Sequence, residues 1–122
     1  MAQTRGQLEA EFSRQMIQFE REHLGRGPEE ARTYIFADVI FVRLAGALTR
    51  AEKHLIRDQE GARLIKEMRL RLMESSREAL EQLVNDLTGC QVVSLHTDLS
   101  TRTGEQIIVF ILDQNLDQAL RK

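Results

Sequence analysis

Residues 92–111, VVSLHTDLSTRTGEQIIVFI, decide the fold, because two apolar runs flank one polar loop in this stretch. Both runs contain several Val or Ile residues, and β-branched side chains favour strands. Gly104 suits a turn position because glycine accepts a positive φ. The stretch therefore predicts a β-hairpin, with strands over residues 90–97 and 106–112.

A second hairpin is predicted earlier in the chain. Residues 33–36 and 39–42, TYIF and VIFV, are again rich in β-branched and aromatic side chains. Ala37 and Asp38 lie between the two runs and are expected to form a tight turn. Arg43 directly follows the second run, where we expect it either to extend toward solvent or to pair with a carboxylate across the sheet.

The first helix is predicted over residues 7–24. Its apolar residues recur every three or four positions, which is the spacing of one helix face. Gly25 and Pro28 end the helix, because glycine accepts a left-handed conformation and proline cannot continue a helix. The residues of the stripe are Leu8, Phe12, Met16 and Phe19.

A capping box opens the second helical region. Thr49 and Glu52 have the spacing at which each side chain accepts from the other residue's backbone amide. Residues 58–61 are expected to kink or restart the helix, and from residue 62 to Gly89 the pattern predicts one helix of about 28 residues, roughly 42 Å long. Such a helix is longer than one small sheet, so part of its stripe is expected to contact another subunit. The alternative is a continuous core helix within one domain. The predicted stripe is Ile65, Met68, Leu72, Ala79, Leu83 and Leu87, flanked by Leu80 and Val84.

Together these elements predict an α+β fold in the order α-β-β-α(α)-β-β. The two local hairpins are expected to form one antiparallel four-stranded sheet, with helices packed on one of its faces. The 122 residues are expected to form a single domain, residues 1–122. Residues 1–5 and 114–122 are expected to be mobile, or to form a short helix over residues 113–122 with its leucines turned inward.

Charge and hydropathy narrow the class of protein. The 17 basic and 19 acidic residues are interleaved and give a net charge of −2, which argues against nucleic acid as a partner. No apolar run reaches the roughly 18–20 residues that span a bilayer, and the first residues lack the apolar segment of a signal peptide. We therefore expect a cytoplasmic protein without direct membrane insertion, which reaches the membrane only through a partner.

The hairpin holds the first group of candidate functional residues. Strand alternation places His96 and Asp98 side by side on one face, with Glu105 across the hairpin. A carboxylate beside an imidazole can set its tautomer for acid–base work, and the three side chains are weak candidates for a zinc, iron or manganese site. A solvated polar pair or a contact with another protein explains them as well. No nucleophile, Cys-x-x-Cys or phosphate-loop motif is present, so we assign no catalytic residue and no cofactor.

Two loops are further binding candidates. Thr101, Arg102 and Thr103 offer hydroxyls, one guanidinium and a flexible backbone, which together can bind an anion. Serine and threonine also favour turns for structural reasons alone. Arg26 lies between two glycines, in a loop that either only ends the first helix or also presents Arg26 to an acidic ligand or partner.

Several segments resemble one bacterial family. They are GP at residues 27–28, LAGALTRAE at residues 44–52, SLHTD at residues 94–98 and TGE at residues 103–105. With the long helix between them, residues 5–113 are similar to the YbcI-type domain, also named MpsC after a component of a sodium-translocating, membrane-potential-generating system. The resemblance implies a soluble accessory protein linked to membrane energetics or inorganic-carbon uptake. It implies no catalytic residue.

We therefore expect a non-enzymatic accessory or regulatory protein that binds a partner protein, such as a membrane transporter. The contact surface is expected on the hairpin over residues 91–106. A homo-oligomer, dimer or higher, is expected to form through the long helix. The alternative is a small metal- or anion-binding enzyme that uses His96, Asp98 and Glu105.

Overall fold

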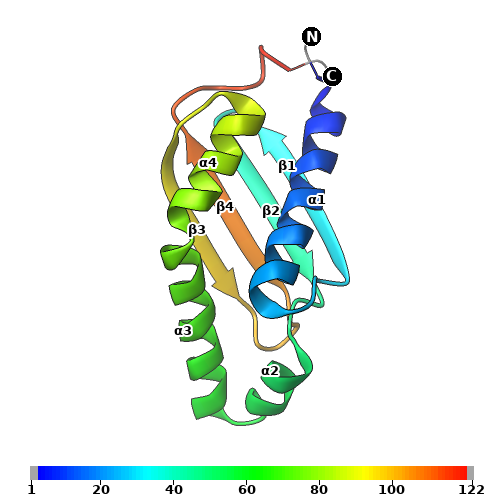
Figure 1. The fold of residues 1–122 in the computed structure, drawn as a ribbon, viewed down its shortest axis with the longest axis vertical. Coiled ribbons are helices and arrows are strands. Elements are labelled where there is room, and N and C mark those ends of the chain that lie inside the picture. Colours follow the sequence, from blue (N-terminus) through cyan, green and yellow to red (C-terminus); the bar gives the residue numbers. More distant parts are fainter. Residues whose placement is uncertain (1–2, 121–122) are drawn as a thin grey trace.

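A computed structural model describes residues 3–120 of the chain. One helix precedes the first hairpin and three lie between the two hairpins (Figure 1). The helices are α1 (Arg5–Leu24), α2 (Arg50–Leu55), α3 (Gln59–Ser75) and α4 (Arg77–Thr88). The strands are β1 (Glu30–Phe36), β2 (Val39–Ala45), β3 (Val92–Leu99) and β4 (Gln106–Leu112).

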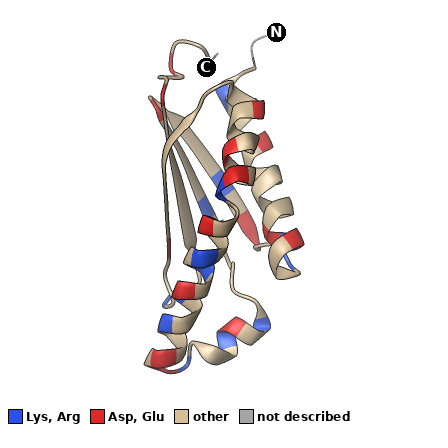
Figure 2. Cartoon of the chain, turned by 60° about the vertical axis from the view of Figure 1, so that its left-hand side comes forward, with Lys and Arg blue, Asp and Glu red and all other residues tan. Residues whose placement is uncertain are grey.

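The four strands form one antiparallel sheet in the order β1-β2-β4-β3, which confirms the predicted α+β fold. Each hairpin pairs locally, and the connection through the helices brings β4 beside β2. β2 and β4 are therefore the central strands, and β1 and β3 are the edges. Seen from the side, α1, α3 and α4 lie on one face of the sheet, and among residues 3–120 no helix covers the other face (Figure 2).

The main core lies between the sheet and the helices, because alternate strand residues turn toward them. The predicted stripe of α1 is buried against the sheet as expected. A second, smaller cluster forms at the α2 end of the molecule from Leu48, Ile65 and Leu99, with Ile56 packed beside them. In the central strands, every second residue is fully buried, namely Ile40, Val42, Leu44, Ile108 and Phe110.

The predicted helix of about 28 residues is wrong in one respect, because the chain leaves the helix at Ser76. There the backbone angles are φ −101° and ψ 9°, so α3 and α4 are separate helices joined end to end. The hydroxyl of Ser75 donates to the carbonyl oxygen of Leu72 at 3.0 Å. Such a contact competes with the helical hydrogen bonds and bends helices, but no proline or glycine marks the break in the sequence.

The buried stripe of α3 and α4 also differs from the predicted one. Ile65 is buried as expected, but Met68 is 37% exposed and Ala79 lies in solvent. The observed stripe instead continues from Ile65 through a charged residue. Its members, at spacings of three and four, are Ile65, Arg69, Met73, Ser76, Leu80 and Val84.

After β4 the chain forms turns, and residues 113–120 contain no helix. The predicted helix over residues 113–122 is therefore wrong for its described part, although Leu116 is buried and Leu120 packs against the core. At the other end, Arg5 is the first residue of α1. Residues 1–2 and 121–122, which belong to the predicted mobile ends, lie outside the described residues. Among those described, no helix has the length and apolar character that a bilayer span requires.

The expected restart of the helix occurs between α2 and α3. Asp58 caps α3 by accepting from the amide of Gly61 at 2.7 Å. The two helices approach so closely that a Cβ on Gly61 would lie 1.8 Å from the carbonyl oxygen of Leu55. Only glycine fits between the end of α2 and the first turn of α3.

We predict that Gly61→Ala lowers the free energy of unfolding by about 1–3 kcal/mol or more, because α2 has to move away from α3. Gly6→Ala in α1 is the control. A Cβ there meets no atom within 4 Å, and the exchange is expected to stabilise the helix by up to about 1 kcal/mol. Urea unfolding measures both, and equal effects of the two substitutions would contradict the close approach.

Candidate functional site

Most predicted site residues lie on the uncovered face of the sheet or in the β3–β4 loop. Directly paired residues of neighbouring strands share a face, so the side chains that point away from the helices form rows across the sheet. We call this surface the open face. It has four rows, ordered along the strands; the first two are called the charged rows and the last two the apolar rows. In order, the rows are Glu30, Ala45 and Glu105; Arg32, Arg43, Ile107 and Asp98; Tyr34, Phe41, Val109 and His96; and Phe36, Val39, Ile111 and Ser94.

The three candidate ligands of a metal are engaged separately. His96 Nε2 lies 3.2 Å from the hydroxyl of Ser94. The carboxylate of Asp98 pairs with Lys66 of α3 at 3.3 Å, and Glu105 pairs with another cation. Within residues 3–120, no group of three or more His, Cys, Asp or Glu side chains is placed to hold a metal ion.

Ion pairs organise the charged rows. Arg43 donates to Glu105 through Nε at 3.0 Å and Nη2 at 2.6 Å, so of its two expected environments the carboxylate pair is the one observed. Arg32 donates to Glu30 at 2.7 Å, and this hydrogen bond lowers the pKa of the Glu30 carboxyl. Glu105 raises the pKa of Arg43 in the same way. These pairs are solvated, so they orient the side chains more than they stabilise the fold.

Within residues 3–120, no helix covers the apolar rows (Figure 2). Tyr34 is 42% exposed and Phe36 is 52% exposed. The rings of Tyr34 and Phe41 lie 6.3 Å apart, and Val109 lies next to Phe41 on the neighbouring strand. Two exposed aromatic side chains, Tyr34 and Phe36, thus lie beside the half-buried Phe41 and Val109 at one end of the open face.

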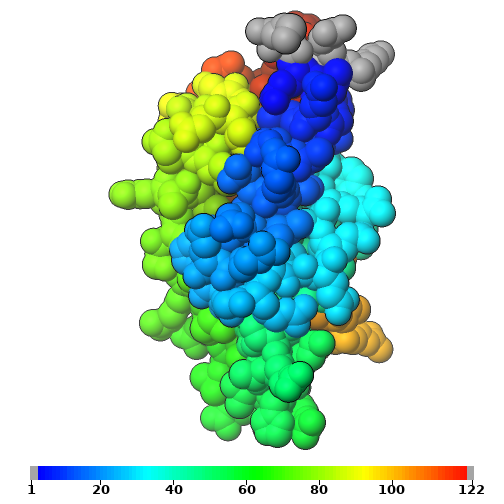
Figure 3. Space-filling model, turned by 45° about the vertical axis from the view of Figure 1, so that its right-hand side comes forward, coloured from blue at the N-terminus to red at the C-terminus, as the bar shows by residue number. Residues whose placement is uncertain are grey.

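The β3–β4 loop forms one wall of a hollow at the α2 end of the molecule. The loop protrudes from the surface (Figure 3). The hollow has a volume of about 460 Å³, and it brings Thr101, Arg102 and Thr103 together with Lys53 of α2 and with Glu29. The predicted loop residues therefore gather at one place, apart from the apolar rows.

Arg26 is held by backbone carbonyl groups. Its Nη1 donates to Leu48 at 3.0 Å and its Nε to Gly27 at 3.2 Å. The preceding Gly25 ends α1 with a positive φ of 84°. Of its two expected roles, the geometry favours the structural one, because the guanidinium ties the end of α1 to the segment before α2.

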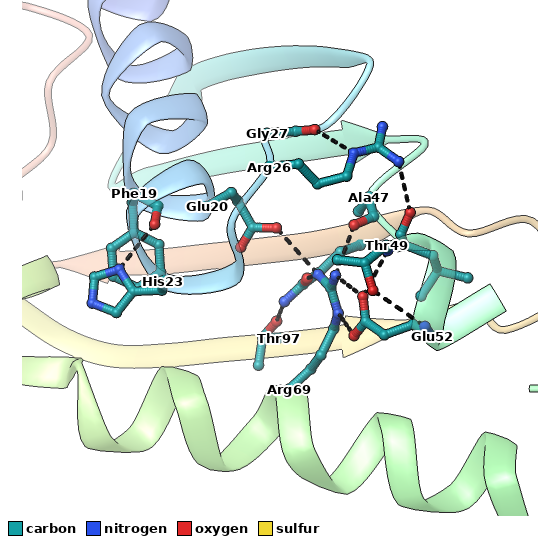
Figure 4. A network of polar contacts seen from close by, with 12 residues as sticks. Phe19, Glu20, His23, Arg26, Gly27, Ala47, Thr49, Glu52, Arg69 and Thr97 are labelled. Atoms are coloured by element: carbon teal, nitrogen blue, oxygen red, sulfur yellow. Dashed lines mark hydrogen bonds and ion pairs between the residues drawn. The ribbon is translucent and has the colours of Figure 1, made fainter. Parts of the chain in front are cut away.

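A buried polar cluster was absent from the sequence prediction. Its centre is Arg69 of α3 (Figure 4), and the Arg69 side chain is only 2% exposed. Nε and Nη2 donate to the two carboxylate oxygens of Glu52 at 2.8 and 2.6 Å, and Nη2 also donates to the carbonyl of Ala47 at 2.7 Å. Nη1 donates to Gln106 at 2.6 Å and to Glu20 at 3.1 Å. All five N–H donors of the guanidinium are used.

The residues around Arg69 come from four parts of the fold. Glu52, which belongs to the predicted capping box, accepts from the amide of Thr49 at 2.8 Å and also binds Arg69. Gln106 of β4 donates to the hydroxyl of Thr97 on β3 at 3.1 Å. One network therefore fixes α1, α2, α3 and the second hairpin relative to one another.

The network holds two carboxylates and one guanidinium. Burial raises the pKa of Glu20, and the attraction of Arg69 offsets this only in part. Burial also acts to raise the pKa of Glu52, but the hydrogen bonds from Arg69 and from the Thr49 backbone outweigh it, so the pKa of Glu52 is lowered. One oxygen of Glu20, Oε2, is buried without a hydrogen-bond partner among the described residues. A proton on Glu20 would leave the cluster neutral.

A cleft of about 370 Å³ opens between α3 and β3 beside this network. Arg69, Gln106 and Thr97 contribute to its lining. Their polar groups are already bonded, since the Thr97 hydroxyl also donates to a backbone carbonyl at 2.9 Å. The Lys66–Asp98 pair also borders the cleft. Its lining therefore offers a ligand few unpaired polar groups.

Comparison with known proteins identifies relatives over nearly the whole chain. Residues 4–114 match the family model described as Na+-translocating membrane potential-generating system (MpsC). Uncharacterized protein YbcI of Bacillus subtilis is 42% identical over 122 residues, which cover 100% of this chain and 98% of the relative. Uncharacterized protein YrhF of the same organism is 26% identical over 110 residues, covering 88% of this chain and 89% of that protein. No solved structure matches the chain.

We predict that Arg69→Leu lowers the free energy of unfolding by about 3–5 kcal/mol, because it leaves Glu20 and Glu52 buried without their cation. Arg71→Leu, two residues further along α3, is the matched control. Arg71 pairs with Glu67 in solvent, so its loss should change stability by no more than about 0.5 kcal/mol. Urea unfolding checks both, and an effect of Arg69→Leu as small as the control's would contradict the role of the network.

We predict that the free energy of unfolding falls as pH rises through the raised pKa of Glu20. Between the ordinary glutamate pKa and the raised one, the folded state binds more protons than the unfolded state, so raising the pH favours unfolding. Glu20→Gln keeps an oxygen acceptor for Arg69 but cannot titrate, and this part of the fall should disappear. Unfolding curves of both proteins from about pH 4 to about pH 8 provide the measurement; identical slopes would contradict the prediction.

Proposed function

The chain belongs to the MpsC family, and from this premise we propose that it is a non-enzymatic accessory protein that acts by binding other proteins of a sodium-translocating, membrane-potential-generating system. Sodium or inorganic-carbon transport is the process that the partner serves in this proposal. A cytoplasmic location, peripheral to the membrane through the partner, belongs to the same proposal.

One observation carries the proposal, namely the apolar rows of the open face. A sheet with one covered face normally alternates between apolar side chains inside and polar side chains outside. Here β1, β2 and β4 place apolar side chains on both faces. Tyr34 and Phe36 are exposed and the other four apolar residues of these rows are half-buried, and contiguous apolar surface of this kind marks contact sites for other proteins. The residues concerned are Tyr34, Phe36, Val39, Phe41, Val109 and Ile111.

Polar residues surround this apolar surface on two sides. His96 stands at the β3 edge, and Asp98 and Arg32 lie at opposite ends of the adjoining charged row. An apolar centre with a polar rim is the usual anatomy of a protein–protein interface. His96 and Asp98 thus contribute to recognition at the rim, while the aromatic residues supply most of the buried area.

We predict that Val109→Asp abolishes partner binding, because it puts an unpaired carboxylate into the centre of the interface. The test is affinity purification of the tagged protein from native membranes and cytosol, followed by mass spectrometry. Leu64→Asp is the matched control, since Leu64 is 56% exposed on α3. If the proposed function is right, partner proteins are recovered with wild type and with Leu64→Asp. Their recovery with Val109→Asp falls at least about tenfold.

His96→Ala and Asp98→Ala probe the rim in the same experiment. Both side chains are exposed, so the fold should tolerate the changes while partner recovery falls. Unchanged recovery with Val109→Asp and with both rim variants would refute the open face as the contact surface.

A further inference from the structure

Building on the proposed function, we infer that the open face, when no other protein occupies it, is covered by a second copy of the chain, related to the first by a two-fold axis that runs parallel to the strands. The two sheets then pack face to face, as in a β-sandwich, at a separation of about 10 Å. The observations that select this partner are the order of the side chains across the rows and the size of the face.

The two-fold axis leaves each row opposite the same row of the second copy. It reverses the order of the strands, so that β1 faces β3 of the second copy and β2 faces its β4. In the apolar rows, Phe41 then meets Val109 of the second copy, and Val39 meets its Ile111. Each of these contacts occurs twice, as a two-fold interface requires, and each joins two apolar side chains.

One charged pair is complementary under the same operation, while Arg43 faces Ile107 of the second copy. Arg32 on β1 and Asp98 on β3 occupy opposite ends of one row, so Arg32 of each copy faces Asp98 of the other. Their side chains are 64% and 76% exposed in the single chain, which leaves both free to add a partner across the interface. Complementary charges at the rim fix the register of an interface.

A two-fold axis perpendicular to the strands gives a poorer match. It would exchange the rows and place Glu30 opposite Phe36 and Glu105 opposite Ile111. Carboxylates would then be buried against apolar side chains, which is unfavourable without a compensating cation. The parallel axis avoids both of these carboxylate contacts and is therefore the one that we infer.

The size of the face sets the expected affinity. Four strands spaced by about 4.8 Å, with seven residues that rise about 3.4 Å each, cover roughly 19 by 24 Å, or about 450 Å² per copy. Specific interfaces usually bury about 800 Å² per partner. The flat area is a lower bound for a corrugated surface, so we expect a dimer near the small end of specific interfaces, with a dissociation constant in the micromolar range.

The geometry also orients the rest of the molecule. Rotation about an axis parallel to the strands keeps both β3–β4 loops and both α2 helices at the same end of the dimer. The hollows that contain Arg102 would then form a pair on one surface. A further component of the assembly could contact the two hollows at the same time.

The first experiment is sedimentation equilibrium of the purified full chain between about 1 and 100 μM. Wild type and Leu64→Asp should approach twice the 14.1 kDa of one chain at the upper concentrations, while Val109→Asp should raise the dissociation constant by about 100-fold or more. A dimer that Leu64→Asp dissociates and Val109→Asp does not would overturn the inference and favour a contact through α3.

A charge exchange tests the axis without touching the apolar rows. Arg32→Asp and Asp98→Arg should each raise the dissociation constant by about tenfold, because like charges then face each other twice. The double variant, with both exchanges in one chain, should restore the wild-type value. Both positions are solvated, so the variants should fold, and circular dichroism checks this. Failure of the double variant to regain the lost affinity would overturn the two-fold arrangement.

The outcome also separates this inference from the proposed function. If wild type is monomeric at about 100 μM but Val109→Asp still loses a co-purified protein, the second copy is refuted and the proposed function stands. If wild type is monomeric and Val109→Asp leaves co-purification unchanged, both are refuted.

Discussion

The arrangement of helices on the sheet depends on the neutralisation of one buried guanidinium. Arg69 is surrounded by acceptors from α1, α2, β4 and the segment before α2, and each of its N–H groups has a partner. Displacing any of these elements leaves a charged donor unpaired away from water, which is strongly unfavourable. Replacing a whole buried ion cluster by apolar residues is often neutral, so its main effect is to specify one arrangement rather than to add net stability.

The same constraint reaches the open face through β4. Gln106 points inward and accepts from Arg69, so the neighbouring Ile107 and the following Val109 must point outward. A shift of β4 by one residue would expose Gln106 and bury the apolar row instead. The register of β4 thus determines both the buried network and the residues of the open face. The contacts on the covered side therefore determine which side chains a partner meets.

The sequence was sufficient for the sheet, the hairpins and the cap of α2, because these follow from local signals such as the Thr49–Glu52 spacing and the Val/Ile runs, but the Thr4–Gln7 capping box of α1 was not predicted. It was insufficient for Arg69, since periodicity assigns a charged residue to solvent unless its partners are known, and Glu20 and Glu52 are distant in sequence. For the same reason, the predicted buried stripe of α3 included Met68 in place of Arg69. The strands of the open face were predicted. Their outer apolar residues can be recognised as one surface only when the order of the strands is known and when one face of the sheet is found without a helix among the described residues.

The short helix α2 depends for its stability on contacts with the rest of the fold. It lies beyond the end of the sheet and is held by the small cluster around Leu48 and Ile65, by the close contact at Gly61 and by the two bonds between Glu52 and Arg69. Six residues form no stable helix in isolation, so once these contacts break, α2 opens as a unit while the sheet and α1 stay folded. Opening α2 would break both bonds between Glu52 and Arg69 and melt the capping box with the helix, so the buried network raises the free energy of this partly unfolded state.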